Sequence, residues 1–112
     1  MFFNNRKKFN GQVAELLPQF GFTLDEAGIM KTANTLDIAW QQKYNHYEAA
    51  LYIAYLVFAG MLKVKEPRAS DVVQRIRSLS SEWVSQGVVR ENLANQFASK
   101  ANEWISKYSE ES

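Results

Sequence analysis

A chain of 112 residues has the length of one domain and can bury a hydrophobic core, so we expect residues 1–112 to form a single unit. Its 46% hydrophobic and 22% charged residues exclude a disordered chain, and the lack of cysteine excludes disulfides, thiolate metal sites and a cysteine nucleophile. The net charge of +1 argues against a protein that binds polyanions through its overall field.

The N-terminal part of the chain predicts a short helix followed by a turn. Phe9 and Val13 recur at helical spacing between about residues 6 and 17, and Pro18 ends the helix because proline has no backbone N–H. We expect residues 1–5 to fray. The basic residues in this segment are not followed by a long apolar run, so the sequence predicts no secretory signal.

A second helix is predicted to begin at residue 23 and to continue to about residue 43. Thr23 and Glu26 have the spacing of a capping box, in which each side chain satisfies a free backbone N–H. Apolar residues then recur at spacings of three and four, which is typical of an amphipathic helix. The expected buried stripe is Ile29, Ala33, Leu36, Trp40 and Tyr44. A smaller patch, Ala27, Met30 and Ile38, lies off this stripe and needs a cover from another element or another chain.

The segment at about residues 45–63 contains the longest uncharged apolar run, from Ala49 to Leu62. As a helix this run is about 21 Å long, shorter than the hydrocarbon layer of about 30 Å, so we expect a central core helix and no transmembrane segment. Asn45 and Glu48 predict a capping box at its start.

Two further helices complete the predicted fold. One begins near Pro67 or Ser70 and ends at Gln86, where Gly87 supplies the left-handed residue that follows many helices. The other runs from about Val89 to Tyr108 and then frays over residues 109–112. We therefore predict an all-α fold, an up-and-down bundle of four long helices plus a short N-terminal helix.

One side of the central helix carries tyrosines and a glutamate, and the other side carries small apolar residues such as Ala50 and Ala54. We expect the small side to face the centre of the bundle and the tyrosine side to face its edge. That edge is either the solvated border of the core or an interface, because tyrosine is common in both places. The candidate interface is Tyr44, Glu48, Tyr52 and Tyr55.

Catalytic and metal-binding signatures are absent from the sequence. His46 is the only histidine, and it lies about 160° around the helix from Glu48, so the two do not form an acid–base pair. No phosphate-binding glycine loop or nucleophile motif occurs. We therefore expect no enzyme activity, no cofactor and no metal.

Basic residues gather between the third and fourth predicted helices, and they favour an alternative function in nucleic-acid binding. Asp71 can pair with Arg75 and weakens this interpretation. The candidate basic patch is Lys63, Lys65, Arg68 and Arg75.

The favoured interpretation is a small soluble, cytoplasmic, non-catalytic protein-interaction module that binds a partner or a second copy of itself. A helical pocket for an apolar small molecule is the remaining alternative. Membrane contact through residues 1–9 is disfavoured because the segment is too short for strong electrostatic binding.

Overall fold

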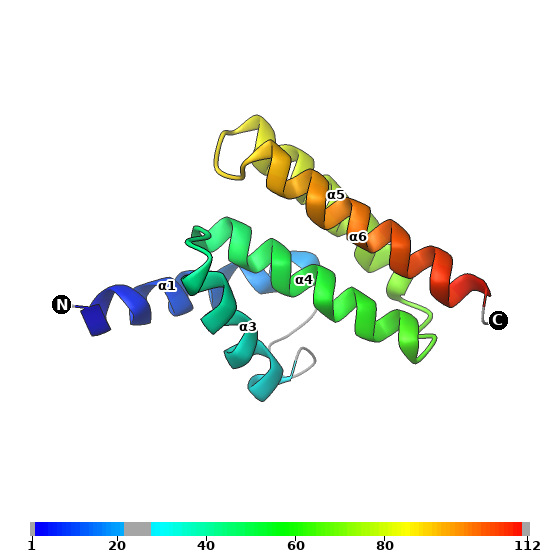
Figure 1. Ribbon diagram of the computed structural model, residues 1–112, viewed down its shortest axis with the longest axis horizontal. Helices are drawn as coiled ribbons and strands as arrows, with labels where there is room; N and C mark the ends of the chain where they lie inside the picture. The colour runs from blue at the N-terminus through cyan, green and yellow to red at the C-terminus, as the bar shows by residue number, and fades with distance from the viewer. Residues whose placement is uncertain (1, 22–27, 111–112) are drawn as a thin grey trace.

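The computed structural model describes residues 2–21 and 28–110, and these residues form five α-helices, a 3-10 helix and no strand (Figure 1). The prediction of an all-α fold is confirmed. The elements are α1 (Phe2–Leu16), η1 (Leu17–Phe20), α3 (Ile29–Gln41), α4 (His46–Lys63), α5 (Ala69–Ser85) and α6 (Glu91–Glu110).

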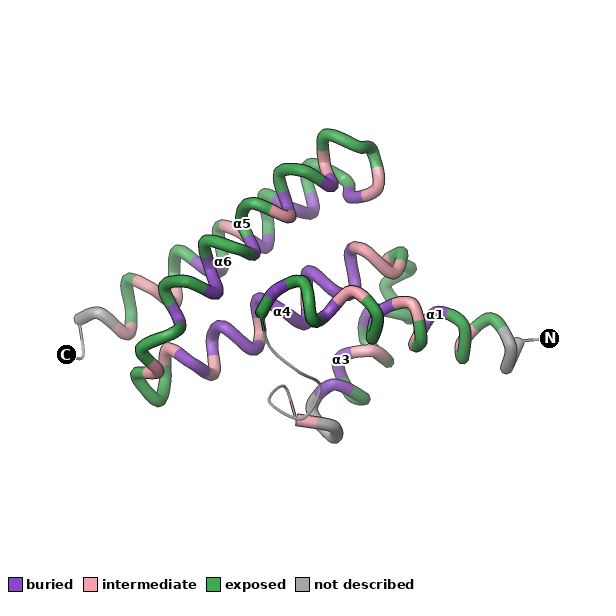
Figure 2. Tube along the Cα trace, turned by 180° about the vertical axis from the view of Figure 1, so that it is seen from behind, coloured by how far each residue is buried: buried purple, intermediate pink, exposed green. Residues whose placement is uncertain are grey.

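Helix α4 is the centre of the arrangement, because α1, η1, α3, α5 and α6 all contact it. Figure 1 shows α1 and α3 on one side of α4, and the antiparallel pair of α5 and α6 on the other. Most of the apolar run of α4 is buried accordingly, and buried residues of the surrounding helices face it (Figure 2). Among the described residues, no helix is long and apolar enough to cross a membrane, as predicted.

The ends of the helices follow from local chemistry. The Asn45 side chain accepts a hydrogen bond from the Glu48 N–H at 2.8 Å, and Glu48 Oε1 accepts one from the Asn45 N–H at 3.0 Å, which confirms the predicted capping box of α4. Helix α5 ends at Ser85, one residue before the predicted end at Gln86, and Gly87 has a φ of 78°, as predicted. The capping box expected at Thr23 and Glu26 lies outside the described residues.

Helix α3 is rotated relative to the prediction. Thr32, Thr35 and Ala39 are buried, whereas Ala33 and Trp40 of the expected stripe are exposed. Threonine can occupy a buried position here because the Thr32 hydroxyl donates a hydrogen bond to the Gly28 carbonyl at 2.8 Å.

The small apolar side of α4 is buried as expected, including Ala50, Ile53 and Ala54. Val64 is 75% exposed because α4 ends one residue before it. Ile38, in the smaller patch of the second predicted helix, is 45% exposed.

Candidate functional site

The tyrosine side of α4 lies mostly inside the protein. Glu48 is 1% exposed and Tyr55 is 2% exposed, so the expectation that they face the edge of the bundle is wrong. The reason is Phe97 of α6, whose ring stacks on Tyr52 at 5.3 Å and meets Tyr44 edge-on at 5.8 Å between centroids. Only Tyr44 and Tyr52, which are half-buried, keep surface for the predicted interface.

The Glu48 carboxylate joins the start of α4 to the start of α6. Besides the Asn45 N–H, it accepts hydrogen bonds from the Arg90 backbone N–H at 3.0 Å, from Nε at 2.8 Å and from Nη2 at 3.1 Å. Burial acts to raise the pKa of Glu48, but these hydrogen bonds and the charge of Arg90 outweigh it and hold the pKa below its usual value. These hydrogen bonds hold the start of α4 to the start of α6.

His46 lies beside Tyr47, with the ring centroids 4.5 Å apart. Burial, followed by the charge of Lys8, lowers the pKa of His46, so the imidazole is neutral at pH 7. Within the described ranges, no three His, Asp or Glu side chains are grouped so that they could hold a metal ion.

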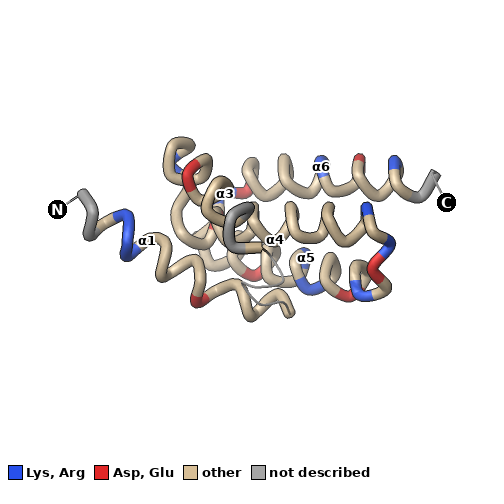
Figure 3. The backbone as a smooth tube through the Cα atoms, turned by 90° about the horizontal axis from the view of Figure 1, so that it is seen from below, with Lys and Arg blue, Asp and Glu red and all other residues tan. Residues whose placement is uncertain are grey.

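The basic residues between α4 and α5 are exposed but do not form a uniform surface. Arg68 Nε lies 3.3 Å from Glu66, and Arg75 reaches the Gln19 carbonyl at 3.4 Å. Asp71 lines the same small hollow of about 160 Å³ as Arg68 and Arg75. Figure 3 shows basic and acidic residues alternating through this region. A nucleic acid would therefore meet a surface of mixed charge and not a uniformly positive one.

A groove of about 210 Å³ separates α1 from α3, and its lining is apolar except for Asn10 and Thr32. The Thr32 hydroxyl already donates a hydrogen bond to the Gly28 carbonyl, so it does not need an acceptor from a ligand. Trp40, 39% exposed, shares the face of α3 that carries Ala33 and Leu36, and Phe9 and Arg6 pack on its ring. The groove is lined by Asn10, Val13, Ala14, Leu17, Thr32, Ala33 and Leu36.

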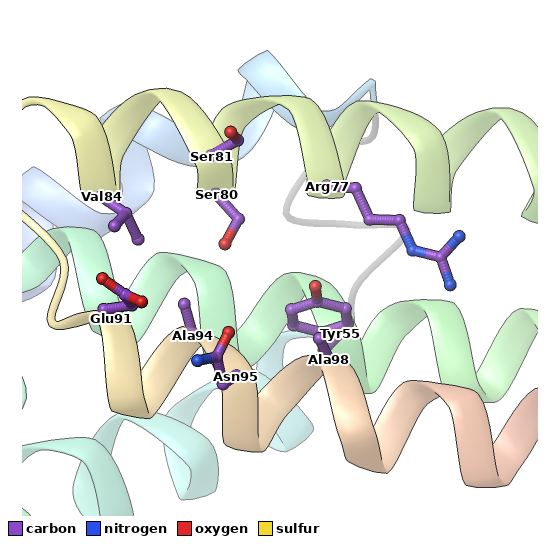
Figure 4. A pocket seen from close by; sticks show the side chains of 9 residues that line it. All are labelled: Tyr55, Arg77, Ser80, Ser81, Val84, Glu91, Ala94, Asn95 and Ala98. Carbon is purple, nitrogen blue, oxygen red and sulfur yellow. The ribbon is translucent and has the colours of Figure 1, made fainter.

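A second groove of about 270 Å³ lies between α5 and α6, on the other side of α4 (Figures 1 and 4). Unlike the first, it has charged and polar groups along its length, and Tyr55 of α4 lies at its floor. The groove is lined by Tyr55, Arg77, Ser80, Ser81, Val84, Glu91, Ala94, Asn95 and Ala98.

The two grooves could not be predicted as sites because each combines residues that are distant in the sequence. The sequence does carry a weak indication of the α5/α6 groove. Ser80, Ser81 and Val84 on α5 lie opposite Ala94 and Ala98 on α6. These small residues at intervals of three and four leave space between the two helices.

No family model, curated protein or solved structure matches this chain. The class that the structure defines is therefore an all-α protein with grooves on opposite sides of a central helix. Function has to be argued from the chemistry of those grooves.

Proposed function

We propose that the protein is a non-catalytic protein-interaction module whose α1/α3 groove receives an apolar side chain from a helix of its partner. The observation that carries the proposal is this groove, an apolar hollow of about 210 Å³ at the surface, next to the exposed ring of Trp40. Apolar surface that is hollowed and flanked by an aromatic ring is typical of protein interfaces, where a few large side chains contribute most of the binding energy.

The volume of the groove favours a protein over a small molecule. Ligand pockets usually hold about 300–1,000 Å³. The α1/α3 groove is smaller. One large side chain suits this space, with the surrounding helix surfaces supplying the rest of the contact.

The proposal is tested by placing a charge in the groove. Ala33 is exposed and lines the groove, so Ala33→Glu puts a carboxylate where the partner's side chain enters and leaves the core intact. Asn34→Glu, at the neighbouring exposed position outside the groove, is the matched control. We expect native mass spectrometry to show a complex, with a second copy or with a protein retained from the source cells, that Ala33→Glu abolishes and Asn34→Glu preserves.

A protein that is monomeric and captures nothing from the source cells would contradict the proposal, as would a complex that both variants weaken equally. Native mass spectrometry of further variants also distinguishes the alternative sites. A complex lost on substitution of Lys65 and Arg68 would support the basic patch instead, and an apolar molecule retained in the purified protein would support a ligand pocket.

A further inference from the structure

The α5/α6 groove differs from the α1/α3 groove because it contains side-chain hydroxyls that form no hydrogen bond with the described residues. The Tyr55 ring is buried, and no described residue forms a hydrogen bond with its hydroxyl, which Figure 4 shows directed toward α5 across the groove. Ser80, 8% exposed, also directs its hydroxyl between the helices (Figure 4). Burial raises the pKa of Tyr55, so this hydroxyl is protonated at neutral pH and can both donate and accept.

Opposite charges occupy the two ends of the groove. At one end, Arg77 Nη2 donates to Asn102 Oδ1 of α6 at 3.0 Å, and this contact holds the guanidinium across the mouth while its other N–H groups remain available to a ligand. At the other end, Glu91 lies in the first turn of α6, where the positive end of the helix dipole attracts a negative charge.

The wall between these charges suits a polypeptide backbone. Ser80, Ala94 and Ala98 are small and leave room for main-chain atoms, and the amide of Asn95 can pair with peptide N–H and C=O groups. The α5 wall runs from Arg77 to Val84, which lies opposite Glu91, and the backbones of Arg77 and Val84 are about 10 Å apart at 1.5 Å per helical residue. The Arg77 side chain extends beyond this length, away from Glu91 (Figure 4). Three extended peptide residues span about the same length.

We propose that the α5/α6 groove binds a short extended peptide with free ends, about three residues long, with its carboxylate at Arg77 and its ammonium group at Glu91. The peptide groups between the two ends bond to the hydroxyls of Tyr55 and Ser80 and to Asn95. This site goes beyond the proposed interaction through the α1/α3 groove, because it lies on the other side of α4 and takes a different ligand.

The experiment is an NMR titration of the full chain with tri-alanine, followed through the backbone amides. We expect saturable shifts that centre on Ser80, Ala94, Asn95 and Ala98. Tri-alanine acetylated and amidated at its ends should bind about tenfold more weakly or not at all, because it has lost both charges. Di-alanine and penta-alanine should also bind more weakly, since their ends are too close together or too far apart for the two charged residues.

Variants test whether the charged residues at the two ends of the groove and the tyrosine at its floor bind the peptide. Arg77→Gln and Glu91→Gln should each weaken tri-alanine binding by about tenfold, whereas Lys100→Gln and Glu103→Gln, charge losses on exposed α6 positions outside the groove, should not. Tyr55→Phe keeps the ring and removes the hydroxyl, so it should weaken binding with the fold retained. Absence of saturable shifts, equal binding of the capped peptide, or equal effects of groove and control variants would overturn the proposal.

Discussion

The Glu48 carboxylate accepts hydrogen bonds from Asn45, three positions before it, and from Arg90, 42 positions after it. The first contact caps α4, and the second attaches the α5/α6 pair to α4. Val88 adds to this attachment because its carbonyl accepts a hydrogen bond from Asn45 Nδ2 at 2.7 Å. One buried side chain therefore supports both a helix end and a tertiary contact.

Glu48→Gln should destabilise the protein by about 2–3 kcal/mol, because the amide cannot accept all the hydrogen bonds that the carboxylate accepts and it removes a charge-assisted pair with Arg90. Urea unfolding followed by circular dichroism measures the loss. Glu103→Gln, at an exposed position, is the control and should change stability by less than about 0.5 kcal/mol. Equal stability of the two variants would show that the Arg90 contact contributes nothing.

The same carboxylate should make stability depend on acid pH. The folded-state pKa of Glu48 lies below its ordinary value of 4.5, so the folded state binds the proton less readily than the unfolded state. The stabilisation from Glu48 is therefore complete above pH 4.5 and is lost as the pH falls through the folded-state pKa. Unfolding free energies measured from pH 6 to pH 3 should fall more steeply for the natural chain than for Glu48→Gln. Parallel curves would contradict this assignment.

The capping role of Glu48 could be predicted from the sequence, because Asn45 and Glu48 are close in the chain and the capping box is a local motif. The burial of Glu48 could not, since it depends on Arg90 from another helix. Tyrosine is ambiguous for a related reason: its ring suits the core and its hydroxyl suits solvent, so the wheel of α4 does not reveal that Phe97 covers Tyr52.

Two glycines differ in backbone conformation, and replacing each by alanine gives a matched pair of variants with opposite expected effects. Gly87 follows α5 with a φ of 78°, and beyond its chain neighbours no atom lies within 4 Å of the place that an added methyl group would take. Gly87→Ala should therefore cost about 1 kcal/mol through backbone strain alone. Gly11 lies within α1 at an exposed position that is equally open, so Gly11→Ala should stabilise the protein by about 0.5–1 kcal/mol. Thermal unfolding of both variants measures the difference in sign, and shifts in the same direction would contradict it.

Helix existence was predictable because apolar residues repeat with the helical period, whereas the buried face of α3 was not. Ala33 and Trp40 fit an apolar stripe, yet Thr32, Thr35 and Ala39 are buried instead. A threonine whose hydroxyl bonds to the preceding turn, as Thr32 does with Gly28, occupies the interior at little cost. Periodicity cannot detect this, because it treats every hydroxyl as a group that needs solvent.

For the whole chain, the position of α4 predicts where the structure opens last. Helices α1, α3, α5 and α6 all contact α4, so exposing its backbone requires most of the core to separate. Amides at residues 51–58 should therefore exchange with deuterium only through global unfolding, with a free energy equal to that from urea unfolding. Amides at residues 5–8, near the start of α1, should exchange through local opening. Faster exchange in α4 than in α6 would contradict this order.

The turn between α4 and α5 contains Val64, which is 75% exposed, and basic residues that proteases readily cleave. The segments on either side of this turn bury their apolar surface against each other, with Phe97 on the tyrosines of α4 and Arg90 on Glu48. A cut in the turn thus separates the backbone without separating two independent domains. The resulting fragments are complementary, since each carries apolar surface that the other covers.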